Sequence, residues 1–280
     1  MPESAKEISK QSKSSFYYAF NLLPKAKRDA MNVIYAFCRK TDDIVDNEQS
    51  NEIKLNNLNL WKQEFESSLE GKSNNQLLIS LSRVIQNFNI PLEPFYDLIK
   101  GMEMDINISR YENFESLKEY CYRVASTVGL ISIEIFGYKN SKTKNFAINL
   151  GIALQLTNIL RDIKKDLESN RIYIPLDEMR MFSYSEEDLF NKKYNDNFIS
   201  LVKYQVERAE SFFKKASSFL SDEDRANMFP ASAMQCVYYK LLKKIIDNNY
   251  DVLNKNIRVN NFEKFYLAFM VWMKHKFIFI

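Results

Sequence analysis

Glycine and proline are scarce in this chain, with 5 glycines and 6 prolines among 280 residues. Sheets joined by tight turns, and glycine-rich phosphate loops, both need more of these residues. Apolar residues instead recur with helical spacing nearly everywhere, and alternating strand-like stretches are almost absent. The sequence therefore predicts an all-α protein. No shift in composition divides it, so we expect a single domain over residues 1–280.

The expected helices follow from apolar spacing and from the prolines that interrupt it. We expect a short first helix ended by Pro24, then helices at Lys25 to Asn47, 52–70, 75–88, after Pro91 and Pro94, from Ser116 through YCYRVASTVGLISIEIFG, at Asn140 to Ser169, 193–220 and 224–248, and at the C-terminus. A loop is expected from Arg171 to about residue 190. Small residues at Ala125, Ser126 and Gly129 fit either close helix packing or a ligand lying against the helix.

Charge and cysteine content exclude several classes of protein. The 39 basic and 36 acidic residues nearly balance, so nothing suggests binding to nucleic acid. Cys38, Cys121 and Cys236 lack metal-type spacing and lie in apolar contexts typical of reduced, buried thiols. The N-terminal segment lacks the apolar stretch of a signal peptide, so we expect a cytoplasmic protein.

The most apolar segment, FYLAFMVWMKHKFIFI, lies near the C-terminus. Lys274, His275 and Lys276 interrupt it well short of the roughly 20 apolar residues that a membrane-spanning helix needs. It fits either a helix packed on the body of the protein or a peripheral contact with the cytoplasmic membrane.

Two aspartate pairs share one spacing, 120 residues apart: Asp42 and Asp46, then Asp162 and Asp166. Residues four apart on a helix lie about 40° apart around its axis, so each pair projects its carboxylates from one face. Each pair also adjoins a strongly apolar stretch, where a carboxylate must be paired, hydrogen-bonded or metal-bound. Both pairs are therefore candidate metal ligands.

Clustered carboxylates without histidine or cysteine partners select a hard cation such as Mg²⁺, usually completed by water and substrate phosphates. A di-iron bundle would need Glu-x-x-His pairs, and the chain has one histidine, His275. Neither pair lies in an EF-hand calcium loop. We interpret the neighbouring Lys164, Lys165 and Glu168 as a solvated face.

Each acidic pair has a nearby arginine that can bind phosphate through two hydrogen bonds. Arg39 lies one turn before Asp42, and Arg161 directly precedes Asp162. The alternative for Arg39 is a structural salt bridge to Asp42 or Asp43. Because the acidic stripes extend from helices otherwise lined by apolar residues, the pattern favours a cavity with a metal and phosphate mouth and an apolar interior, which suits a prenyl diphosphate.

Four long segments resemble the squalene and phytoene synthases, the head-to-head (1'–1) prenyl transferases: SSFYYAFNLLPKAKRDAMNVIYAFCRKTDDIVD, GMEMDI, EYCYRVASTVGLISIEIFG and NLGIALQLTNILRDIKKDLESNRIYIP. The resemblance extends from about Ser12 to Asp188 and is loose beyond it. It implies an all-α isoprenoid synthase fold, with helices around a central apolar cavity and two Asp-rich motifs facing each other across it.

The resemblance also implies roles for individual residues. The metal ligands would be Asp42, Asp46, Asn158, Asp162 and Asp166; the diphosphate contacts Ser15, Tyr35, Arg39, Gln155, Arg161, Arg171, Tyr238 and Arg258; and the residues lining the prenyl chain Phe16, Phe20, Val124, Val128, Leu150 and Leu154. Tyr120 matches a tyrosine near the reacting centre, so the residues expected to carry catalysis are Arg39, Asp42, Asp46, Tyr120, Asp162 and Asp166. The segment RVNNFEKFYLAFMVW lacks the family's basic run, so Lys264 is not counted among the contacts.

The aromatic residue Phe20 matches a family position that limits chain length, which favours farnesyl diphosphate over the longer geranylgeranyl diphosphate. The predicted activity is condensation of two farnesyl diphosphates to presqualene diphosphate, onward to squalene or dehydrosqualene, with Mg²⁺ or Mn²⁺ as the metal and with NADPH if the product is squalene. The alternative is a phytoene synthase that condenses two geranylgeranyl diphosphates, and the non-enzyme alternative is an inactive prenyl-diphosphate-binding or helical partner subunit. Expected partners are the prenyl diphosphate, the membrane surface and downstream isoprenoid enzymes.

Overall fold

The computed structural model describes residues 20–47 and 49–277, which are mostly helical. No strand forms within these ranges, where an isolated bridge joins Arg110 to Ile172. The helices are α3 (Lys25–Asp46), α4 (Asn51–Leu69), α5 (Gln76–Phe88), α6 (Glu93–Asn107), α7 (Phe114–Cys121), a π-helix η1 (Tyr122–Ser126), α8 (Thr127–Phe136), α9 (Lys142–Glu168), α10 (Leu176–Met181), α11 (Glu186–Phe190), α12 (Asp196–Phe219), α13 (Asp222–Arg225), α14 (Phe229–Asp247) and α15 (Asn261–Phe277). This confirms the all-α prediction.

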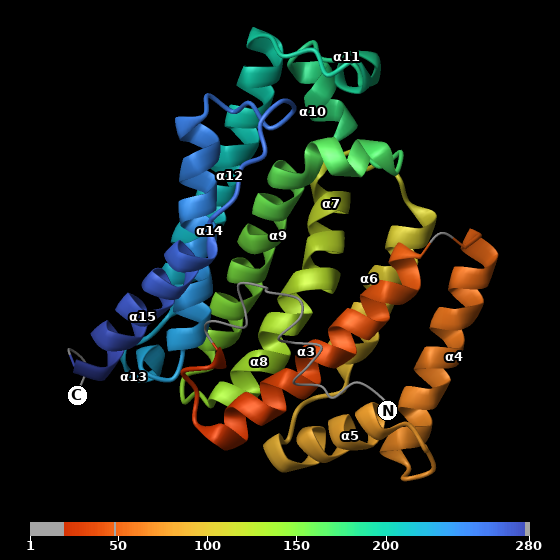
Figure 1. The fold of residues 1–280 in the computed structure, drawn as a ribbon, viewed down its shortest axis with the longest axis vertical. Coiled ribbons are helices and arrows are strands. Elements are labelled where there is room, and N and C mark those ends of the chain that lie inside the picture. Colours follow the sequence, from red (N-terminus) through yellow and green to blue (C-terminus); the bar gives the residue numbers. More distant parts are fainter. Residues whose placement is uncertain (1–19, 48, 278–280) are drawn as a thin grey trace.

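Helix α9 is the centre of the arrangement (Figure 1). Helices α12 and α14 pack against it on one side, and α7, η1 and α8 pack against it on the other. Its buried positions span most of its length and more than one face, as expected for a helix surrounded by others. Helices α3 and α6 lie beyond α8, with α4 and α5 at the periphery (Figure 1). The second aspartate pair therefore lies on a helix that most of the fold surrounds.

Small residues allow the helices around α9 to approach closely. A Cβ added at Gly151 of α9 would lie 2.5 Å from the Cα of Ser126 in η1, and one at Gly101 of α6 would lie 2.8 Å from Val124. Ser126 is fully buried, and its hydroxyl donates to the Ile148 carbonyl at 2.7 Å. Of the two uses considered for the small residues, close packing therefore applies at Ser126, whereas Ala125 and Gly129 line a cavity.

Short polar side chains begin several helices. Ser50, Asn75, Asn113 and Asn195 accept hydrogen bonds from the free backbone N–H groups of α4, α5, α7 and α12, respectively. At the start of α9, the buried Asp224 accepts from the backbone N–H groups of Lys139 and Asn140 and from the Thr143 hydroxyl. These hydrogen bonds fix α13 to the start of the central helix.

Most predicted helix boundaries are confirmed to within a few residues, and the helix expected from Ser116 is present with a π-helical turn inside it. Two expectations were wrong. The segment expected as a loop before residue 190 contains α10 and α11, which are too short to show a helical period. Cys236 is exposed, whereas Cys121 is buried and Cys38 partly buried. No described helix combines the length and hydropathy needed to cross a membrane.

We predict that Gly151→Ala destabilises the protein. The added methyl group would press on the backbone of Ser126 at 2.5 Å, and backbone cannot move aside as a flexible side chain can. We expect a loss of about 1–3 kcal/mol in the free energy of unfolding, which outweighs the ~1 kcal/mol that alanine gains over glycine within a helix. Urea denaturation measures it, with Lys164→Ala at an exposed site of the same helix as the control. An alanine variant as stable as the parent would contradict the packing argument.

Candidate active site

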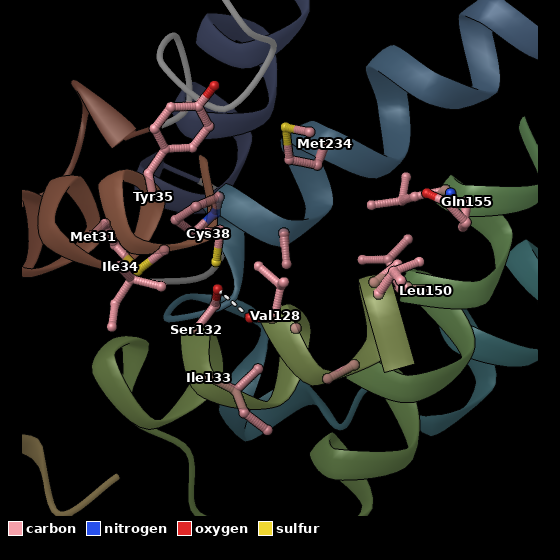
Figure 2. A pocket seen from close by; sticks show the side chains of 18 of the residues that line it. Met31, Ile34, Tyr35, Cys38, Val128, Ser132, Ile133, Leu150, Gln155 and Met234 are labelled. Atoms are coloured by element: carbon pink, nitrogen blue, oxygen red, sulfur yellow. Dashed lines mark hydrogen bonds between the residues drawn. The ribbon is translucent and has the colours of Figure 1, made fainter. Parts of the chain in front are cut away.

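A cavity of about 310 Å³ lies among α3, the η1–α8 segment, α9 and α14. This volume falls within the roughly 300–1,000 Å³ typical of ligand sites. Figure 2 shows Met31, Ile34 and Cys38 on one side of it, Val128 and Ile133 on another, and Leu150 and Met234 opposite. Its inner surface is therefore apolar and comes from segments far apart in the sequence.

The predicted chain-lining residues meet at this cavity. Within the described ranges these are Phe20, Val124, Val128, Leu150 and Leu154, and all five line it. Phe20 and Leu150 are almost fully buried. Phe16, and the predicted diphosphate contact Ser15, lie outside the described residues.

Polar residues from three helices also line the cavity. Tyr35, Arg39 and Asp42 come from α3. Gln155 and Asn158 come from α9, and Tyr238 from α14. Asp42 of the first motif and Asn158 beside the second thus line one apolar cavity, whereas Asp162 lines a second pocket.

Carboxylates around the cavity repel one another. Burial, followed by repulsion from Asp46, raises the pKa of Asp42 to about 6. Burial, followed by repulsion from Asp162, raises the pKa of Asp166 to about 7. Asp105 on α6 contributes to the rise at both positions. The two acidic pairs therefore share one electrostatic environment, and a bound divalent cation would relieve the repulsion.

Arginines partly offset this repulsion. Arg39 contacts Asp42 at 3.4 Å and Asp43 at 2.7 Å, and all three side chains are about half exposed. The salt bridge considered as an alternative role for Arg39 is therefore present. Arg161 holds Asp162 through two hydrogen bonds, the longer being 2.8 Å from Nε to Oδ1. The guanidinium groups of Arg39 and Arg161 both bind carboxylates, and a phosphate could replace those carboxylates as their partner.

A second, polar pocket adjoins Tyr238 on the α14–α15 side of α9. Its cationic lining consists of Arg161, Lys165, Arg258 and Lys264. Burial, together with repulsion from Arg161 and Arg258, lowers the pKa of Lys264. Lys264, which was not counted among the diphosphate contacts, lines this pocket. Lys165 is exposed, as expected for a solvated face, but it also lines the pocket. Lys164 and Glu168 are exposed as expected.

A buried network that the sequence did not reveal lies between the two acidic pairs. The Tyr173 hydroxyl donates to Asp105 Oδ1 at 2.5 Å, and Arg171 pairs with Asp105 Oδ2 at 3.2 Å. The ring of Tyr120 stacks on Tyr173 at 5.3 Å between centroids, and the two hydroxyls are hydrogen-bonded. Arg171, predicted as a diphosphate contact, thus holds Asp105.

Burial, followed by the charge of Asp105, raises the pKa of Tyr120 well above its usual value. The phenol therefore stays protonated at neutral pH. Asp105 belongs to the GMEMDI segment, but the sequence does not show that this residue lies near the two aspartate pairs.

The donor set fits Mg²⁺. The side-chain oxygen of Asn158, one turn before Asp162, is buried and has no hydrogen-bond partner in the described part of the chain, which is unusual unless a ligand completes it. Within the described residues, no group of three acidic, histidine or cysteine side chains encloses a single ion. Ions at the separate pairs would therefore need further oxygen ligands from water or a phosphorylated substrate.

Comparison with known proteins decides the family. The profile of the squalene/phytoene synthase family matches residues 9–263. The chain belongs to this family. A 15-cis-phytoene synthase from Synechococcus elongatus is 34% identical over 274 residues, which cover 94% of this chain and 89% of the relative. A chloroplastic phytoene synthase from an Oncidium hybrid cultivar is 36% identical over 92% of this chain, and the match spans 64% of that longer relative.

Solved structures place the chain in the isoprenoid synthase fold of this family. A dehydrosqualene synthase in complex with a ligand superposes with a TM-score of 0.83, at 29% identity, over 97% of this chain and 95% of that one. A squalene synthase from Alicyclobacillus acidocaldarius gives a TM-score of 0.81 at 24% identity, over 88% of this chain and 93% of that one. The expected fold, with helices around an apolar cavity, is confirmed.

We predict that Asp166→Asn stabilises the metal-free protein at alkaline pH. A carboxyl group whose pKa rises from about 3.9 unfolded to about 7 folded costs stability above pH 7, and the cost vanishes as the pH falls toward 4. We therefore expect the free energy of unfolding in EDTA to rise by about 1–2 kcal/mol at pH 8, and by little at pH 4. Urea denaturation at the two pH values measures it.

The matched control is Glu207→Gln, which removes one carboxylate from an exposed position on α12. It should change stability equally little at both pH values. A destabilised Asp166→Asn variant at pH 8 would show that the carboxylate is not under repulsion.

Proposed function

We propose that the protein is a Mg²⁺-dependent prenyl transferase that joins two geranylgeranyl diphosphates head to head, as a phytoene synthase. The observation that carries this proposal is the convergence of both aspartate motifs, with the unpartnered Asn158 oxygen, beside one apolar cavity. A phosphate-binding mouth on an apolar chamber suits a substrate with one diphosphate and a long hydrocarbon chain. The intact acidic motifs weigh against an inactive binding subunit.

The proposed substrate, geranylgeranyl diphosphate, differs from farnesyl diphosphate, which the sequence favoured. That preference rested on Phe20, which does line the cavity. Relatives that are 34–36% identical carry the name phytoene synthase, and they support the longer substrate more strongly than a single aromatic residue supports the shorter one. The likeness to a dehydrosqualene synthase at 29% identity keeps farnesyl diphosphate as the second candidate.

Diphosphate groups would be held by two sets of residues. Tyr35 and Arg39 serve the cavity wall beside the first aspartate motif. Arg161, Arg258 and Lys264 serve the second pocket. Bound Mg²⁺, held by the aspartates and Asn158, would neutralise the charge on the departing diphosphate. Because burial and like charge lower the pKa of Lys264, an anion beside it would relieve that repulsion.

The apolar cavity would protect the allylic cation formed when one diphosphate leaves. Apolar side chains such as Ile34, Val128 and Leu150 exclude water from the cavity, which favours attack by the double bond of the second substrate. The new carbon–carbon bond moves the positive charge onto the second chain. Loss of a proton then closes the cyclopropane ring of prephytoene diphosphate.

Tyr120 and its network offer a route for that proton. A protonated phenol can accept a proton only if it passes its own onward. The hydrogen bonds lead from Tyr120 to Tyr173 and then to Asp105, a carboxylate held by Arg171. We assign Asp105 as a positioning residue that orients Tyr173 and Tyr120 and takes up the relayed proton. Released diphosphate is the competing base.

The substrate assignment is tested by incubating the purified protein with Mg²⁺ and either geranylgeranyl or farnesyl diphosphate, with and without NADPH, and identifying the lipid by mass spectrometry. We expect phytoene or prephytoene diphosphate from the longer substrate, and none in EDTA. Presqualene diphosphate, dehydrosqualene or squalene from farnesyl diphosphate alone would establish the second candidate. Absence of a coupled product from both substrates would refute the enzymatic proposal.

We predict that Asp105→Asn lowers kcat by about 100-fold with little change in KM, because the variant keeps the shape of the site and loses the proton acceptor. Asp105→Glu should recover part of the lost rate, since it restores a carboxylate. Steady-state kinetics with the accepted prenyl diphosphate measures both, and circular dichroism confirms the helical fold.

Tyr173→Phe is a second, independent test of the relay. It keeps the ring stacked on Tyr120 and removes the hydroxyl that donates to Asp105. We expect its kcat to fall to a similar extent. Normal turnover in this variant would leave released diphosphate as the base and exclude the relay.

A further inference from the structure

Two linkers run side by side near the end of the central helix. We call residues 108–113, between α6 and α7, the first linker, and residues 169–175, between α9 and α10, the second linker. The second linker leads to α10 and α11, at one end of the molecule (Figure 1). The backbone N–H groups of Ile172, Leu176 and Asp177 donate to carbonyl groups of the first linker at 2.9–3.0 Å. The first linker therefore guides the chain as it leaves α9.

The second linker carries the side chains that hold Asp105. Arg171 pairs with the Asp105 carboxylate at 3.2 Å and donates to the Asp105 backbone carbonyl at 3.1 Å. The Tyr173 hydroxyl donates to the other carboxylate oxygen. Arg171 and Tyr173 are two positions apart, so both depend on where the same short stretch of backbone lies. The position of the second linker therefore decides whether both side chains reach Asp105.

Arg110, in the first linker, binds the point at which the second linker turns away from α9. Its Nη1 donates to the Asn170 carbonyl at 2.6 Å, and its Nη2 donates to the Asn170 side-chain oxygen at 3.1 Å. Asn170 directly precedes Arg171 and has a φ of 55°, in the left-handed region with which many helices end. Arg110 thus binds a backbone and a side-chain acceptor of the residue that sets the direction of the second linker.

The guanidinium group of Arg110 also contacts α11 and its own linker. Its Nε donates to Glu186 on α11 at 2.9 Å, and its Nη1 donates to the Ser109 carbonyl at 2.9 Å. It lies 5.9 Å from the ring centroid of Phe190, within the range of a cation–π contact. The Arg110 side chain is 22% exposed. Its planar fork therefore joins three segments at once, which the single charged nitrogen of a lysine cannot do.

We propose that Arg110 is a positioning residue for prenyl transfer that acts through Arg171 and Tyr173. By fixing the second linker, it keeps both side chains on Asp105, the carboxylate at the end of the proposed relay. Arg110 lines neither the apolar cavity nor the second pocket, so its effect on substrate binding should be small. This role rests on the proposed function, because it concerns the proton relay of that reaction.

The first test measures the second linker itself, without substrate. Hydrogen–deuterium exchange followed by mass spectrometry compares the parent with Arg110→Lys, which keeps the charge and loses the fork. We expect the amides of residues 171–177 to exchange about tenfold faster or more in the variant, because charge-assisted hydrogen bonds that hold the linker are lost. Unchanged exchange in this peptide would overturn the proposal.

The matched control is Arg180→Lys. Arg180 on α10 forms an ion pair with Glu112 of the first linker, and the two side chains are 62% and 63% exposed. An ion pair as exposed as this contributes little to stability. We expect exchange and turnover to match those of the parent. A change equal to that in Arg110→Lys would indicate a general loosening of this region and would overturn the specific role of Arg110.

The second test uses steady-state kinetics with the accepted prenyl diphosphate. We expect Arg110→Lys to lower kcat by about tenfold with little change in KM, because small displacements of a catalytic network have effects of this order. In combination with Tyr173→Phe it should cause no further loss, since the phenylalanine has already interrupted the relay. A double variant whose two losses multiply would show that Arg110 acts by another route and would overturn the proposal.

Failure of this proposal can be distinguished from failure of the proposed function. A parent that yields no coupled product refutes the function and, with it, the role of Arg110 in the reaction. An active parent whose Arg110→Lys variant keeps full turnover overturns the role of Arg110 alone.

Discussion

Repulsion among carboxylates around the cavity is the constraint on which the rest of the structure depends. Asp42, Asp105 and Asp166 come from three helices, and the charge of Asp105 adds to the rise in the pKa of the other two. The fold must hold them together against this repulsion. Their nearest cations, Arg39 and Arg171, offset it only in part. The free energy that keeps the site assembled therefore comes from elsewhere in the structure.

That free energy comes from close packing of the helices on α9. Gly151 and Ser126 bring the backbones of α9 and η1 into close contact, and Gly101 leaves room on α6 for the Val124 side chain of η1. Contacts of this kind fix helix positions to a fraction of an ångström, because a single added methyl group cannot be accommodated. The carboxylates are thus placed by backbones that have little freedom to relax away from one another.

The sequence predicted those parts of the site that lie on a single helix. The spacing of Asp162 and Asp166 identifies one helical face, and the apolar period around the pair locates the helix itself. The resemblance to a family then supplied the predicted chain-lining positions, and two of these residues, Val128 and Leu150, line the cavity. In each case the information is local, or is carried by a long motif.

What the sequence did not predict depends on contacts between distant segments. Asp105 and Tyr173 are 68 positions apart, and no periodicity links a carboxylate on α6 to a phenol after α9. Lys264 joins Arg161 only because α15 folds back beside α14. Cys236 is exposed although Met234 and Val237 nearby in the sequence are buried, since it lies on the outer side of its helix. Such features follow from tertiary packing alone.

The π-helical turn between α7 and α8 has a consequence for how the site tolerates change. A π turn holds one residue more than an α turn, so it offsets the helix after it by about 100° from the helix before it. Tyr120, before η1, faces Tyr173, and Val128, after η1, faces the cavity, within one almost continuous rod. Deleting one residue of η1 would restore a regular helix and turn one of these side chains away. The length of this segment is therefore as strictly defined as the identity of its residues.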